Sequence, residues 1–97
     1  MIKINNYKTI SEIYKSSNSV IYKGLDEKDG KSVVIKILNK EYPTPEDLKS
    51  FQYEFDILND LKIEGVVKNY EIVDYRNSKA IIMEDFGGES RLYYDKN

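Results

Sequence analysis

The sequence contains no cysteine and no histidine among its 97 residues. The absence of cysteine excludes disulfide bonds and thiolate metal sites, and it fits a cytoplasmic protein. The absence of histidine removes the Ser-His-Asp and Cys-His catalytic arrangements, together with the usual zinc sites. Any chemistry must therefore use carboxylates, lysines, hydroxyl groups or backbone dipoles.

The chain also lacks an excess of charge, because its formal net charge is −2. No basic field therefore indicates binding to nucleic acid or to an anionic membrane. No apolar run approaches the length of a membrane span. Hydrophobic residues make up 40% of the chain, which is enough for one modest core, so we expect a single domain over residues 1–97.

Segments of β-type dominate the hydrophobic pattern. They are predicted at residues 7–14, 20–25, 32–38, 66–75 and 79–83. The segment 32–38 is the strongest because of its density of β-branched residues. Asp29-Gly30 predicts a hairpin turn before it, and Ile10 and Ile13 are the apolar residues of the first segment.

One helix is predicted between the third and fourth strands. Thr44 has the N-cap position, Pro45 the first helical position, and acidic residues follow at 46 and 47, near the positive end of the helix dipole. The helix should run to about Leu61 or Lys62 and end at Gly65. Its apolar face is predicted from the helical period and comprises Leu48, Phe51, Phe55 and Leu58, widened by Ile57 and Leu61. Short connections between strands then predict an α+β fold, in which the helix packs on a five-stranded antiparallel sheet.

Two charged residues interrupt these apolar patterns. Lys36 lies inside the strongest strand, and Glu54 lies within the apolar arc of the helix, where none of its helical neighbours is a cation. A strand lysine usually extends its ammonium group to solvent. A carboxylate in an apolar arc needs a partner or access to water, however, so we expect Lys36 and Glu54 to pair and to join the helix to the sheet.

Several motifs in this order resemble the N-terminal lobe of protein kinases. Val33-Val34-Ile35-Lys36 is similar to the kinase V-A-I-K strand, and the segment 53–58 is similar to helix C, with Glu54 as its paired glutamate. Further similarities are at Ile21-Tyr22-Lys23-Gly24, Gly65-Val66-Val67-Lys68 and residues 81–88. Within the family, the sequence at 42–46 and 84–90 resembles the N-terminal serine/threonine kinase-like domains of large bacterial hybrid signalling proteins. Those proteins often also carry an ATPase module, a GAF domain and a histidine kinase.

The resemblance implies an ATP site, with Lys36 on the α- and β-phosphates and Glu54 orienting Lys36. It implies that Ile13, Ile21 and Val34 flank the adenine, that Met83 is the gatekeeper, and that backbone groups near Glu84 and Phe86 bind the base. From the residues alone, sheet core is the favoured explanation of these apolar positions.

The sequence also departs from the family pattern. The glycines of the phosphate loop are replaced by Tyr14, Ser16 and Ser19, so a plain serine-rich turn is the alternative to a phosphate-binding loop. Asp85-Phe86-Gly87 has the letters of the kinase magnesium motif, but it follows an apolar strand at the hinge position, and we reject it as a metal site. The H-R-D loop needs a histidine, so we expect the catalytic base and the magnesium ligands to lie in a C-terminal lobe beyond Asn97, and the fragment alone not to be catalytic.

Three interpretations follow. The chain is the ATP-binding lobe of a serine/threonine kinase, or a pseudokinase-like interaction module that self-associates or binds a partner protein. The third is an unrelated sheet-plus-helix domain, which would be favoured if Lys36 and Glu54 lay far apart on opposite sides of the sheet.

Overall fold

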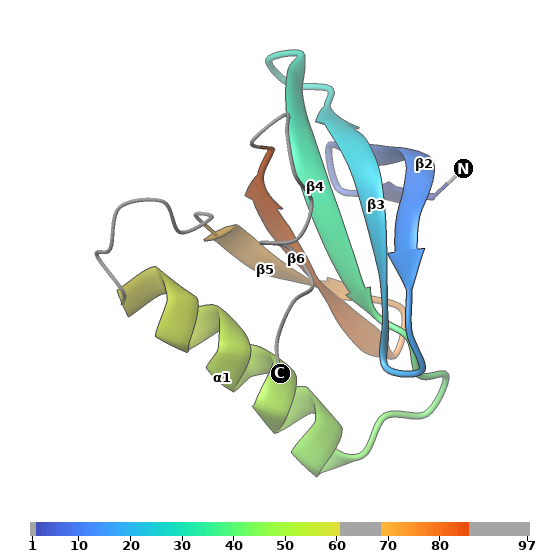
Figure 1. The fold of residues 1–97 in the computed structure, drawn as a ribbon, viewed down its shortest axis with the longest axis vertical. Helices are drawn as coiled ribbons and strands as arrows, with labels where there is room; N and C mark the ends of the chain where they lie inside the picture. The colour runs from blue at the N-terminus through green and yellow to red at the C-terminus, as the bar shows by residue number, and fades with distance from the viewer. Residues whose placement is uncertain (1, 61–68, 86–97) are drawn as a thin grey trace.

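The computed structural model describes residues 2–60 and 69–85, which form one sheet and one packed helix (Figure 1). The elements are β1 (Lys3–Ile4), β2 (Tyr7–Lys15), β3 (Ser19–Asp26), β4 (Lys31–Leu38), α1 (Pro45–Asp60), β5 (Asn69–Tyr75) and β6 (Ser78–Glu84). The sheet has the order β1-β2-β3-β4-β6-β5, and every neighbouring pair is antiparallel. The predicted α+β class is confirmed, with one strand more than expected. The predicted residues Leu61, Lys62, Gly65, 66–68, Phe86, Gly87 and Gly88, and the side chain of Leu58, lie outside the described residues.

The additional strand is β1, a two-residue segment that pairs with the start of β2. The chain reverses between them at Asn5, which has a φ of 54°. Asparagine tolerates this left-handed conformation better than most residues do. Two residues are too few to produce a periodic hydrophobic signal, and for this reason the sequence did not predict β1.

The side chains of β4 alternate between two buried layers. The helix-side cluster comprises Ile21, Val34, Leu38, Phe51, Ile81 and Met83, with Leu48, Phe55 and Ile72 packed against it. The back cluster lies on the other face of the sheet and comprises Ile4, Tyr7, Val33, Ile35, Ile37, Ala80 and Ile82, with Ile2, Tyr22, Val73 and Tyr75 at its margin. Because both of its faces are covered, β4 is apolar almost throughout, as its sequence suggested.

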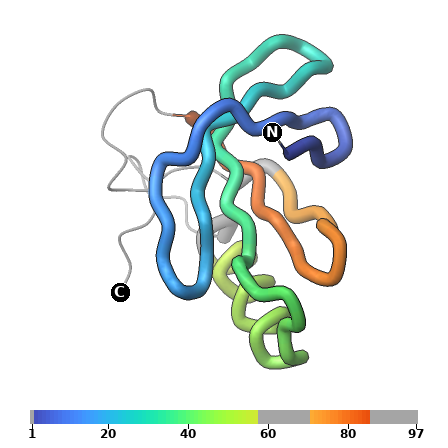
Figure 2. The backbone as a smooth tube through the Cα atoms, turned by 90° about the vertical axis from the view of Figure 1, so that its right-hand side faces the viewer, coloured from blue at the N-terminus to red at the C-terminus, as the bar shows by residue number. Residues whose placement is uncertain are grey.

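The N-terminal segment covers part of the back cluster. In Figure 2 it bends toward the side of the β5–β6 hairpin. The Tyr7 hydroxyl donates a hydrogen bond to Glu71 on β5, so the first and last parts of the sheet are joined across this layer. Burial, and then the bond to Glu71, raise the pKa of Tyr7, which keeps its hydroxyl protonated as a donor.

The second half of β2 is exposed, contrary to its apolar pattern. Ile10 is 58% and Ile13 is 37% exposed, and two irregularities interrupt the register with β3 in this region. A β-bulge shifts which side chains face each side, so simple alternation fails here. Tyr7 and Thr9 are the buried residues of β2 instead.

The helix begins at the predicted residue. The Thr44 hydroxyl accepts a hydrogen bond of 3.0 Å from the backbone N–H of Asp47, and the Asp47 carboxylate accepts one of 2.9 Å from the N–H of Thr44. This reciprocal pair satisfies two amides that the helix leaves without partners. Along the helix Phe51 is buried as predicted, whereas Ile57, which was expected to widen the apolar face, is 41% exposed. The helix packs mainly on β5 and β6, and its Phe51 also belongs to the cluster with Val34 and Leu38 of β4.

Replacing Thr44→Ala should lower the free energy of unfolding by about 1 kcal/mol, because the Asp47 amide loses its acceptor. The hydrogen bond from the Thr44 backbone holds the pKa of Asp47 below its ordinary value, so this carboxylate stabilises the fold above the unfolded pKa and loses that effect as pH falls through the folded pKa. Urea denaturation at neutral pH measures the first effect. Ser50→Ala, in the exposed part of the same helix, is the control and should leave stability equal or slightly higher.

Replacing Gly24→Ala should cost about 1–3 kcal/mol of stability through overpacking. A Cβ at this position would lie 2.7 Å from Cδ1 of Ile35 and 2.7 Å from the backbone oxygen of Lys8, and Ile35 is fully buried. Gly30→Asn is the matched control, because its φ of 76° is accessible to asparagine and a Cβ there meets nothing within 4 Å. Equal thermal midpoints for the two variants would contradict the close packing at Gly24.

Candidate functional site

The candidate site is built around Lys36 in the middle of β4. Its strand partners are Ile21 on β3 and Ile81 on β6, and both are fully buried. The alternation of β4 directs Lys36 to the face that carries the helix-side cluster. An ammonium group in such surroundings has lost most of its hydration, and it requires an anionic or hydrogen-bonding partner.

Glu54 of α1 provides that partner. The Lys36 ammonium group donates a hydrogen bond to the Glu54 carboxylate, forming an ion pair between the helix and the centre of the sheet. The Lys36 side chain is 8% exposed and that of Glu54 is 31% exposed, so the cation is the more deeply buried partner. The structure therefore joins the two residues that interrupted the apolar patterns. This pairing removes the arrangement that would have favoured the interpretation as an unrelated domain.

The other residues of the predicted nucleotide site are only partly brought together. Ile21, Val34 and Met83 belong to the helix-side cluster, on the same face of the sheet as Lys36. Ile13 lies on the exposed half of β2 and belongs to neither cluster. Ile21 and Val34 offer almost no accessible surface in this conformation, although the resemblance implies that they flank a base.

The serine-rich turn between β2 and β3 is held by its own hydrogen bonds. The Ser16 hydroxyl accepts bonds from the backbone N–H groups of Asn18 (3.3 Å) and Ser19 (3.1 Å). The N–H of Ser16 donates to the Ser19 carbonyl at 2.8 Å, and the Asn18 carbonyl accepts a 2.7 Å bond from Asn39 after β4. This is the compact arrangement typical of serine in turns. These amides are therefore engaged within the protein, and to bind a phosphate they would have to exchange partners.

The hinge region contains an ion pair that the sequence did not suggest. Lys23 on β3 lies 3.1 Å from the Asp85 carboxylate, whose side chain is 8% exposed. The two residues are far apart in the chain, and no local pattern connects them. Asp85, the first residue of the D-F-G sequence, thus pairs with a lysine. Glu84 precedes it at the end of β6, and Phe86 lies outside the described residues.

Within residues 2–60 and 69–85, no three side chains of His, Cys, Asp or Glu come together as metal ligands. In that part of the protein, no helix combines the length and the apolar character that a membrane span requires.

The order of the sheet, the helix after β4 and the Lys36–Glu54 pair define the class of fold, which is the N-terminal lobe of a protein kinase. A solved structure of the kinase PpkA, PpkA-294 in its apo form, superposes with a TM-score of 0.75 at 12% sequence identity. The match covers 87% of this chain and 37% of that one. At this identity the match establishes the fold alone.

Sequence relatives agree with this class. MAP3K epsilon protein kinase 1 of Arabidopsis thaliana is 38% identical over 80 residues, covering 82% of this chain. Probable serine/threonine-protein kinase MARK-A of Dictyostelium discoideum is 31% identical over 90 residues, covering 92% of this chain. No family model matches. The chain is similar to the N-terminal lobe of serine/threonine protein kinases, and it spans only 6% and 8% of the length of these two relatives. The narrower likeness to bacterial hybrid signalling proteins stays a prediction.

The unequal burial of the ion pair predicts unequal costs of breaking it. Glu54→Gln should destabilise the fold by about 1–3 kcal/mol, below the range for fully buried pairs, because it leaves the buried Lys36 cation without an anion. Lys36→Met should cost less, because the exposed part of Glu54 becomes hydrated while methionine fills the space of the lysine stem. Urea denaturation of both single variants and of the double variant measures the coupling.

The control for this cycle is Lys79→Met, which removes a lysine from the more exposed pair with Asp74. Its cost should be within about 1 kcal/mol. If Lys36→Met proved more destabilising than Glu54→Gln, the buried cation would not be the residue that depends on the pair.

Proposed function

We propose that this chain is the ATP-binding lobe of a serine/threonine protein kinase, and that residues 1–97 form one lobe of a larger catalytic domain. The observation that carries the proposal is the Lys36–Glu54 pair. A lysine held by a helix carboxylate beside the apolar face of a sheet provides a positioned cation for phosphate oxygens. The similarity to serine/threonine kinases over 80 to 90 residues supports this class of activity.

In this proposal each residue has a limited role. Lys36 contacts the α- and β-phosphates, and Glu54 keeps its ammonium group oriented. Ile21, Val34 and Met83 flank the adenine, with Ile13 closing the site from β2. Backbone groups near Glu84 and Phe86 bind the edge of the base, and the hydroxyls of Ser16 and Ser19 lie nearest the phosphates.

Phosphotransfer itself needs groups that these 97 residues do not contain. The chain has no histidine for an H-R-D loop, and the described residues hold no cluster of magnesium ligands. In the proposal, the base and the ligands for Mg²⁺ belong to a C-terminal lobe. A cytoplasmic location, expected from the composition, stays part of the proposal.

Nucleotide binding requires two local changes in this conformation. The side chains that cover Ile21 and Val34 must move enough to admit a base, because both residues are fully buried. The Ser16 hydroxyl must release the amides of Asn18 and Ser19 if these are to bind phosphate. Both changes reduce the apparent affinity, because the binding-competent conformation is then only a fraction of the population.

The direct test is titration of the chain with MgATP, with binding measured by calorimetry and by amide NMR shifts. Lys36→Ala should weaken binding by about 10- to 100-fold, the range expected for a lost charge-assisted hydrogen bond. Lys79→Ala is the matched control, because it removes a lysine from the β5–β6 hairpin, away from the candidate site, and should bind like the parent chain. Equal affinities of the Lys36→Ala and parent chains would contradict the proposal.

A second candidate is a pseudokinase-like module that binds another protein without nucleotide. The self-bonded serine turn favours it, because its amides already have partners. The exposed Ile10 and Ile13 on β2 also favour it, because apolar side chains on an open strand are available for association. In this case the Lys36–Glu54 pair has only a structural role. Failure of the parent chain to bind MgATP, together with self-association in sedimentation, would favour this candidate over the first.

A further inference from the structure

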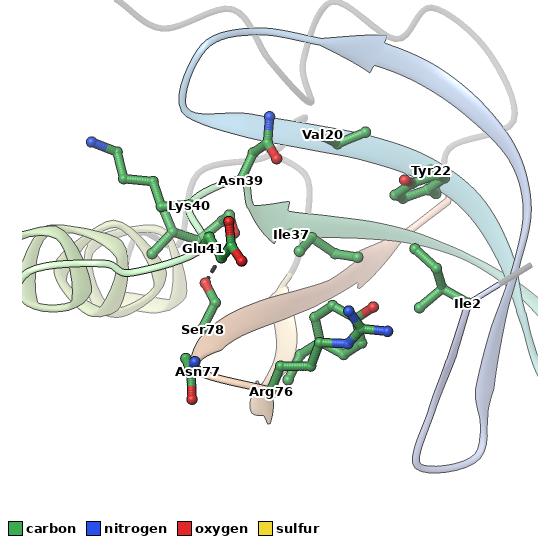
Figure 3. A pocket seen from close by; sticks show the side chains of 12 residues that line it. Ile2, Val20, Tyr22, Ile37, Asn39, Lys40, Glu41, Arg76, Asn77 and Ser78 are labelled. Atoms are coloured by element: carbon green, nitrogen blue, oxygen red, sulfur yellow. Dashed lines mark hydrogen bonds between the residues drawn. The ribbon is translucent and has the colours of Figure 1, made fainter.

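A pocket lies on the back face of the sheet, away from Lys36, with a volume of about 440 Å³ (Figure 3). It is formed by the ends of β3 and β4, the segment after β4, and the β5–β6 hairpin. Volumes of this size are typical of sites for small molecules. None of the residues of the proposed nucleotide site lines this pocket.

The pocket has an apolar floor and aromatic sides. Val20 and Ile37 are buried strand residues that face each other across β3 and β4, and Ile2 approaches from the N-terminal segment. The rings of Tyr22 and Tyr75 add to the wall. These apolar and aromatic residues release water readily to an apolar group of matching size, whereas the rest of the lining is polar.

Arg76 is the most unusual residue of the pocket. It has a φ of 56°, in the left-handed region where glycine or asparagine is favoured, yet this turn position carries a long cationic side chain. Its guanidinium group lies over the Tyr75 ring, 5.3 Å from the ring centre. Among the described residues, no carboxylate forms an ion pair with Arg76. The guanidinium group is therefore held at the edge of the pocket with donors available for a ligand.

The other polar groups of the pocket include one carboxylate, Glu41, which lies on the side away from Arg76. Burial raises the pKa of Tyr22, followed by the charge of Glu12 and the nearby Tyr75, so its hydroxyl remains a donor at neutral pH. Figure 3 shows Glu41 beside Lys40 and Ser78, whereas Arg76 lies on the side of Ile2. Ser78 donates its hydroxyl to the Leu38 carbonyl at 2.9 Å, so it closes the pocket rather than offering a ligand group.

We propose that this pocket binds a small carboxylate with an apolar body, such as an aryl or branched alkyl acid. The carboxylate accepts hydrogen bonds from Arg76 in the two-point geometry that a guanidinium group favours, and the apolar body lies on Ile37 between the tyrosine rings. The positive φ of Arg76 belongs to the two-residue turn between β5 and β6, and this turn places the cation at the edge of the pocket. The site does not depend on nucleotide binding, because it lies on the opposite face of the sheet from Lys36.

The test is titration of the ¹⁵N-labelled chain with phenylacetate, with binding monitored by amide chemical shifts. The expected result is saturable shifts at Ile37, Arg76 and Asn77, with the amides of α1 around Glu54 unchanged. Phenylacetamide, the neutral compound of the same shape, should bind at least tenfold more weakly, because it cannot pair with the guanidinium group. Equal shifts with both compounds, or none with phenylacetate at millimolar concentration, would overturn the proposal.

Two variants separate binding from folding. Arg76→Gly removes the cation and suits the left-handed backbone, so the chain should stay folded while phenylacetate affinity falls at least tenfold. Lys28→Gln, in the exposed β3–β4 turn, is the charge-matched control and should bind like the parent chain. If a folded Arg76→Gly chain bound phenylacetate as tightly as the parent, Arg76 would not be the anion-binding group and the proposal would fail.

Discussion

The ion pair between Lys36 and Glu54 is the interaction on which the arrangement of this lobe depends. A cation in the centre of β4, between two fully buried isoleucines, is tolerated only if an anion reaches it. In the described part of the chain the anion comes from α1, whose Glu54 forms the ion pair with Lys36. The pair therefore specifies where the helix lies, whereas the apolar contacts of Phe51 and its neighbours supply most of the burial.

The alternation of β4 separates the two proposed sites. Lys36 and Val34 face the helix, and the proposed nucleotide site lies on that side. Ile35 and Ile37 face the other way, into the back cluster and the pocket beside Arg76. One strand thus contributes to both sites through side chains one residue apart, because successive residues of a strand point to opposite faces. A ligand bound on one face could influence the site on the other face only by displacing β4.

Much of the architecture was predictable, for local reasons. The β-branched run of β4, the Thr44 N-cap and the turn at Gly30 each express a strong short-range preference, and each appears where it was expected. The positions of Lys36 and Glu54 in apolar patterns predicted their pairing, because a buried charge needs a partner of opposite charge or access to water. The exposure of Ile13 and Ile57 could not be predicted from the sequence. An apolar side chain indicates that burial would be favourable, but it does not show that a partner surface is present.

The sequence by itself determined the strand and helix segments, the kinase-like order of motifs and the need of Lys36 for an anion. Hydrophobic periodicity, capping and the cost of burying charge act within a few residues or on a single side chain. Only the tertiary structure decided that β1 folds back along β2, that Lys23 meets Asp85, and that Arg76 borders a pocket formed by distant segments. The contact of Lys23 with Asp85 and the pocket beside Arg76 join residues far apart in the chain, and their energies depend on how the sheet twists and packs, which no local pattern encodes. The pairing of β1 with β2 is local, but β1 is too short to give a periodic signal.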